Sequence, residues 1–360
     1  MIRAALGQAG AVIRLLPIVS LLLLGGCRCD EQRRATPPSS LQPPRVRLEL
    51  GRRVSAADQA GQLLAAGTPE GEVLLMSRAP DGSGLVVLRD GEGQVHDGAV
   101  TRVQLDRDGG RLLSLGGHVA AVWDTRARKL LRRVSGPQLL TAGALLPGGD
   151  AVFFGTSQGH VLRWEVSSPQ AAAVAHFACG GTRVPPARLR LPEKQRCTYG
   201  HYVETPEGPP ACLYPVTQLL LLDDRHLARV CRTGEAAVME LGSRRLSFFS
   251  PGHLAALAPV PGPGRRLLLG RADGELRLFS LAERKVIRTL EPTGKPAAAA
   301  AGGALVAAVQ GRTLRLWHPE EPRPVARVEL PGPAIWLRLV PGEVDALLAD
   351  GRLLTVSHQR

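Results

Sequence analysis

The chain has 360 residues, a formal net charge of +13 at pH 7 and an aromatic content of only 4%. Its arginines are scattered along the sequence rather than massed beside stacking aromatic side chains, and this pattern argues against a nucleic-acid-binding protein. Two explanations of the charge stay open. Either the arginine bias reflects a GC-rich genome, or it attracts an anionic partner such as lipopolysaccharide phosphates or an acidic protein.

Residues 1–26 are predicted to be a lipoprotein signal peptide. Two basic residues, Arg3 and Arg14, accompany an apolar run that ends in Leu24-Gly25-Gly26-Cys27. This tetrapeptide resembles the bacterial lipobox, and the resemblance implies that Cys27 is acylated and becomes the new N-terminus. An uncleaved membrane anchor is the alternative, although the run is shorter than the roughly 20 residues of a spanning helix.

Residues 27–44 are rich in proline and serine, have no apolar periodicity and are predicted to be a tether. Arg28 follows Cys27, where an aspartate would signal retention under the enteric sorting rule. By analogy with that rule, we expect the outer membrane of a bacterial envelope rather than the inner one.

Residues 45–357 are predicted to form an all-β, seven-bladed β-propeller. A bulky apolar residue follows a turn glycine by five or six positions and recurs about every 40 residues, the period of a four-stranded blade. These residues are Met76, Trp123, Trp164, Met239, Phe279, Trp317 and Val356. We place the blades at about 54–89, 99–134, 140–178, 215–250, 253–290, 296–329 and 334–357. The last blade has only three strands, and the alternating run Arg45–Leu50 supplies a fourth that closes the ring and protects its edge.

Blade two carries the residues that place this repeat in a family. His96 precedes the first strand, an Asp-Gly turn follows that strand, and Trp123-Asp124 ends the third strand. The sequence thereby resembles the WD40 repeat, and the resemblance implies hydrogen bonds within the blade among His96, Ser114 and Trp123. Further residues of the pattern, to which we assign structural roles in their blades, are Asp124, Trp164, His253, Asp273, Phe279 and Trp317.

Residues 180–215 are predicted to be an insertion between blades three and four. The step from Trp164 to Met239 spans 75 residues, and subtracting about one repeat leaves roughly 35. Tyrosine and arginine are enriched at interaction hot spots, and both gather here. The candidate partner-binding residues are Tyr199, Tyr202, Tyr214, Arg188 and Arg190. The alternative is a solvated decoration that only covers the central channel.

Four cysteines lie around this insertion. In an oxidising compartment Cys179, Cys197, Cys212 and Cys231 predict two disulfides, with three connectivities open. A metal site formed by Cys179, Cys197, His201 and Cys212 is the competing interpretation, but the spacing lacks the close Cys-x2-Cys pairs of zinc sites. We therefore expect no metal and no cofactor.

The sequence holds no coherent catalytic set. Gly155-Thr156-Ser157-Gln158-Gly159 matches the nucleophile elbow, but it lies between two predicted strands and is predicted to be a hairpin turn. We expect a monomeric, lipid-anchored envelope propeller that binds envelope proteins without catalysis. In architecture and anchoring it loosely resembles the propeller lipoprotein of the outer-membrane barrel assembly machinery. The alternatives are a propeller enzyme of the quinoprotein or glycan-lyase type, which needs a ring of inward-facing acids, histidines and tryptophans, and a ligand or metal sensor centred on the insertion.

Overall fold

The fold is seen in a computed structural model. It describes residues 42–77, 84–91, 93–173, 179–183, 201–205, 208–249, 253–260, 265–291, 294–302 and 305–358. The signal peptide, Cys27 and nearly all of the tether therefore lie outside the described residues. Contacts divide the chain between Pro37 and Pro38, and all strands belong to the second unit.

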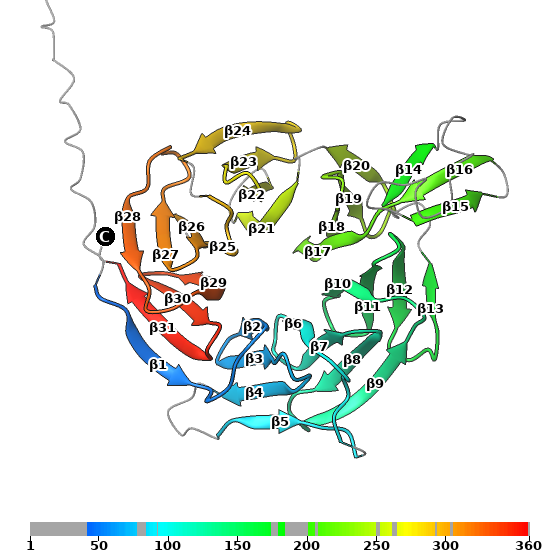
Figure 1. The fold of residues 1–360 in the computed structure, drawn as a ribbon, viewed down its shortest axis with the longest axis horizontal. Helices are drawn as coiled ribbons and strands as arrows, with labels where there is room; N and C mark the ends of the chain where they lie inside the picture. The colour runs from blue at the N-terminus through cyan, green and yellow to red at the C-terminus, as the bar shows by residue number, and fades with distance from the viewer. Residues whose placement is uncertain are drawn as a thin grey trace, which may run out of the picture. The chain divides into compact units, whose positions relative to one another are not determined.

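Within the described residues, that unit contains seven four-stranded antiparallel sheets arranged around a ring (Figure 1). Blade one is β2 (Ala56–Ala60), β3 (Leu63–Gly67), β4 (Val73–Ser77) and β5 (Val86–Leu88). Blade two is β6 (Val100–Leu105), β7 (Arg111–Gly116), β8 (Val119–Asp124) and β9 (Lys129–Ser135). Blade three is β10 (Leu140–Leu145), β11 (Ala151–Thr156), β12 (Val161–Glu165) and β13 (Ala171–Ala173).

The chain then forms a separate three-stranded sheet before it returns to the ring. This sheet is β14 (Gly180–Arg183), β15 (His201–Thr205) and β16 (Gly208–Leu213), with β16 in the middle. Blade four is β17 (Val216–Asp223), β18 (His226–Cys231), β19 (Ala236–Glu240) and β20 (Leu246–Phe249). Blade five is β21 (Leu254–Val260), β22 (Arg266–Arg271), β23 (Leu276–Ser280) and β24 (Lys285–Leu290).

The last two blades complete the circle. Blade six is β25 (Ala298–Gly302), β26 (Leu305–Gln310), β27 (Thr313–Trp317) and β28 (Ala326–Glu329). Blade seven is β29 (Ala334–Val340), β30 (Glu343–Leu348), β31 (Arg352–Ser357) and β1 (Arg45–Glu49). The first strand of every blade contacts the first strand of the next, and β29 contacts β2. The predicted seven-bladed propeller is confirmed.

The burial pattern follows from the position of each strand within its blade. The second and third strands are packed between neighbouring blades, so they are apolar on both faces, as in β7 and β8. The outer strand faces water and is mostly polar, as in β9. Blades pack through shared apolar clusters; one of these joins Val73 of blade one to Val103 and Trp123 of blade two. This burial of apolar surface between blades holds the ring together.

Strand β1 lies far from β31 in sequence but pairs with it. The two are antiparallel, with Arg45 opposite Thr355 and Glu49 opposite Arg352. The side chain of Arg47 forms an ion pair at 3.3 Å with Glu343 of β30, which lies beyond β31 in the sheet. Blade seven therefore combines residues from both ends of the described chain. None of the described segments forms a helix of the length and apolarity needed to cross a bilayer.

Candidate functional site

A buried hydrogen-bond network lies in blade two, where the sequence resemblance placed it. The hydroxyl of Ser114 accepts from Trp123 Nε1 at 2.9 Å and lies 2.8 Å from His96 Nε2. All three residues are fully buried. Burial lowers the pKa of His96 to about 4, so its ring is neutral at pH 7. The network ties the segment before β6 to β7 and β8.

Asp124 does not join this network, because its carboxylate faces the turn after β8. It accepts from the backbone N–H groups of Ala127 at 2.8 Å and Arg126 at 3.0 Å, and it pairs with Arg111 at 2.5 Å. The bond from Ala127 is the main cause that lowers the pKa of Asp124. Asp124 therefore holds the turn between the third and fourth strands.

Three residues at the position of Trp123 in other blades do not form this network. Trp164 donates to the carbonyl of Ser168 at 2.8 Å. Trp317 Nε1 is buried without a partner among the described residues. Phe279 stacks on Phe249 of blade four at a ring-centroid distance of 4.8 Å.

In blade five the sequence pattern matches but the network is not formed. His253 is exposed, and Asp273 pairs with Arg271 at 2.5 Å. Asp273 also accepts from the backbone N–H of Glu275, so it stabilises its own turn. The structural contribution of Asp273 is thus local to the turn between β22 and β23.

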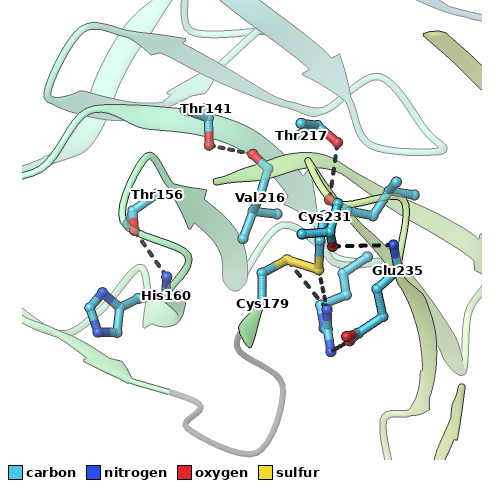
Figure 2. The surroundings of a disulfide bond; sticks show 11 residues. Thr141, Thr156, His160, Cys179, Val216, Thr217, Cys231 and Glu235 are labelled. Carbon is cyan, nitrogen blue, oxygen red and sulfur yellow. Dashed lines mark hydrogen bonds and ion pairs between the residues drawn. A yellow bond between two sulfur atoms is a disulfide. The ribbon is translucent and has the colours of Figure 1, made fainter. Parts of the chain in front are cut away.

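The base of the three-stranded sheet is fixed to the ring by a disulfide (Figure 2) and by backbone hydrogen bonds. Cys179 is bonded to Cys231 at the end of β18, which confirms a disulfide among the predicted cysteines. The backbone N–H of Cys179 donates to Gly159 at 2.8 Å, and that of Tyr214 donates to Cys179 at 2.9 Å. The residues that flank the segment 180–213, Cys179 and Tyr214, are therefore joined directly by a backbone hydrogen bond.

Gly159 is required at this base. Its φ is +88°, and a Cβ there would lie 2.6 Å from the Tyr214 carbonyl oxygen and 2.8 Å from that of Cys179. A side chain would push the two ends of the segment away from blade three. Val216 continues the attachment, because its carbonyl accepts from the hydroxyl of Thr141 at 2.5 Å.

A buried arginine lies beside the disulfide. Arg229 contacts both sulfur atoms and pairs with Glu235 at 2.8 Å. Burial lowers the pKa of Arg229, and the bond to Glu235 opposes that change. Sequence reasoning missed Arg229; the signal was a charged residue in the centre of the otherwise apolar run of β18.

The predicted binding residues are only partly placed. Tyr202 and Cys212 lie opposite one another on β15 and β16, and Tyr214 is half-buried just after β16. Arg188, Arg190, Cys197 and Tyr199 fall outside the described residues. The alternative metal site would need Cys179 as a ligand, but Cys179 is bonded to Cys231 in the disulfide. No cluster of metal-ligating side chains is found in the described part of the chain.

The central channel is also concave. A cavity of about 500 Å³ is lined by the first strands of six blades. Its charged lining residues are Asp58, Arg102 and Arg338, and its one aromatic residue is Trp336. The ring of acids, histidines and tryptophans that a propeller enzyme needs is not found in this lining. The Gly155–Gly159 motif forms the turn between β11 and β12, as predicted.

No protein-family model matches the chain, and no curated protein matches it. Solved structures do. The crystal structure of the WD40 repeats of RRP9 aligns with a TM-score of 0.64 at 14% identity, covering 89% of this chain and 100% of that chain. The structure of U3-55K aligns with a TM-score of 0.63 at 15% identity, covering 88% and 98%. At such identities the likeness shows the fold, a WD40-type propeller.

Proposed function

We propose that the protein is a monomeric, non-catalytic interaction scaffold, anchored by lipid in a bacterial envelope, that binds envelope proteins through residues 180–215. The frame is a rigid ring, and the proposed binding segment is an insertion between two of its blades. Propellers host many unrelated functions, so the proposal depends on this segment and not on the fold.

The observation that carries the proposal is the way the segment is attached. A disulfide to Cys231 holds its base on blade four, and the backbone bond from Cys179 to Gly159 holds it on blade three. Binding loops supported by a rigid scaffold are preorganised, which lowers the entropy lost on association. The tyrosines and arginines of the segment are the residue types that contribute most at such surfaces.

The envelope location is supported by two independent features. Disulfides persist in secreted and periplasmic proteins, and Cys179 is bonded to Cys231. The sequence Leu24–Cys27 resembles a lipobox, and the residue after it favours the outer membrane. Acyl chains on Cys27 would retain the protein on a bilayer, since each buried methylene contributes about 0.8 kcal/mol.

We further propose that β1 closes the ring. Its pairing with β31 supports this proposal, because without β1 the edge of blade seven would be open. An open edge favours association with other chains. A closed ring agrees with a monomeric scaffold.

The partner contact is tested by cross-linking in intact envelopes. Tyr199→Ala combined with Tyr202→Ala removes two candidate anchors, each contributing about 1–2 kcal/mol at a hot spot. We expect specific cross-linked products to weaken strongly. The control is Arg126→Ala, an exposed residue in a turn of blade two. Undiminished products in the double variant would overturn the role of the segment.

The anchor is tested separately with Cys27→Ala. This variant is expected to take up no labelled palmitate and to remain uncleaved or soluble after export. A processed, membrane-retained variant would contradict the lipobox interpretation while leaving the partner contact untouched.

A further inference from the structure

The central channel holds two arginines that lack hydrogen-bond partners. Arg102 on β6 and Arg338 on β29 are half-buried and line the same cavity. Within the described part of the chain, neither guanidinium makes a hydrogen bond or an ion pair at contact distance, and the Nε of Arg102 is buried without a partner. A guanidinium is always charged and presents five N–H donors, so unused donors in a confined space favour an acceptor ligand.

Among the described residues that line the channel, the only acid does not satisfy them. Asp58 accepts from the backbone N–H of Leu105 at 2.8 Å, so part of its acceptor capacity is used by blade two. Burial raises the pKa of Asp58, while the hydrogen bond from Leu105 and attraction from Arg102 and Arg338 oppose that rise. Two positive charges therefore face at most one negative charge, and the lining has a net charge of at least about +1.

Apart from three glutamines, Gln59, Gln104 and Gln218, the rest of the lining is apolar or small. Alanines of β21 and β25, including Ala256, Ala258 and Ala300, leave room on one side, and Trp336 and Leu220 add apolar surface. The cavity of about 500 Å³ lies in the size range of small-molecule sites. A bare inorganic anion would satisfy the arginines but would leave the apolar surface unused.

We propose that the channel binds a carboxylate carried on a slim aliphatic stem, with Arg102 and Arg338 holding the carboxylate and the alanine-rich strands contacting the stem. Arginine suits this role because its planar group donates two parallel hydrogen bonds to one carboxylate. The ligand is either a free short-chain acid or a glutamate side chain, since both carry a carboxylate on an aliphatic stem.

Calorimetric titration of the purified full chain tests the site with five probes. These are hexanoate, hexylammonium, inorganic phosphate and the pair N-acetyl-glutamic acid amide and N-acetyl-glutamine amide. Hexanoate or the glutamic acid amide is expected to bind, and whichever binds more tightly identifies the stem. Binding of hexylammonium as tight as that of hexanoate would overturn the charge argument, and equally tight phosphate would overturn the role of the stem.

Three variants locate the site. Arg102→Gln and Arg338→Gln are each expected to weaken carboxylate binding about 10- to 100-fold, the range for a charge-assisted hydrogen bond. Asp58→Asn keeps an acceptor for Leu105 but removes the competing charge, so it is expected to tighten binding about threefold or more. A general loss of folding cannot produce that increase. Exposed Arg323→Gln is the control. The absence of binding to the parent, or the same loss in the control, would refute the proposal.

Discussion

Ser114→Ala should destabilise the protein more than any other removal of one hydroxyl from blade two. Among the described residues, its oxygen is the only hydrogen-bond partner of Trp123 Nε1 and of His96 Nε2, and all three side chains are buried. Leaving a buried polar group unpaired costs about 1–3 kcal/mol. Two such groups give an expected loss of about 2–6 kcal/mol.

The loss is large against the net stability of a domain, about 5–15 kcal/mol. Urea unfolding followed by tryptophan fluorescence measures it, with the midpoint expected to fall while the slope stays constant. The matched control is Ser135→Ala on the exposed outer strand of the same blade, for which we expect a change within about 0.5 kcal/mol. If Ser114→Ala and the control unfold at the same urea concentration, the network does not hold blade two together.

Three further predictions concern single residues. Ala308→Ser places a hydroxyl two residues beyond the strand partner of Trp317, the same position that Ser114 has relative to Trp123. The new hydroxyl gives the Trp317 indole an acceptor, so the free energy of unfolding should rise by about 1 kcal/mol. An unchanged urea midpoint would contradict this prediction. Arg128→Gly relieves a left-handed residue with φ +54° and should add about 1 kcal/mol, whereas Arg126→Gly in the same turn should not, by the same assay. The pKa of His96 is lowered to about 4 in the native protein, so below about pH 6.5 the unfolded chain binds a proton that the native chain does not. The free energy of unfolding should therefore be at its full value above that pH and fall by about 3 kcal/mol toward pH 4. His96→Gln should lose this pH dependence.

The sequence predicts the ring well because its signal is local. Each blade needs two apolar strands separated by short turns, and that pattern is visible in any stretch of 40 residues. The last blade, predicted at 334–357 with three strands of its own, corresponds to β29, β30 and β31, which together span 334–357. The hydrogen-bond network of blade two was expected from the resemblance of this blade to the WD40 repeat, not from that pattern.

Features that depend on contacts between blades could not be read in this way. Spacing alone left three cysteine connectivities open, whereas the observed bond joins Cys179 to a cysteine 52 residues later across the junction of two blades. His253 matches the repeat in sequence but is exposed. Alternation along a strand places Arg338 and Trp336 on one side of β29, but only the closed ring shows that this side lines the channel.

The central claim is that residues 180–215 bind the partner while the ring supports them. Its most direct test is to replace residues 180–213 with a short Gly/Ser linker, which the 2.9 Å bond between Tyr214 and Cys179 makes possible. Loop-closure entropy changes slowly with length, so the variant should melt close to the parent. We predict that this folded variant loses the cross-linked partners of the parent in intact envelopes. A folded variant that captures the same partners with equal yield would contradict the claim.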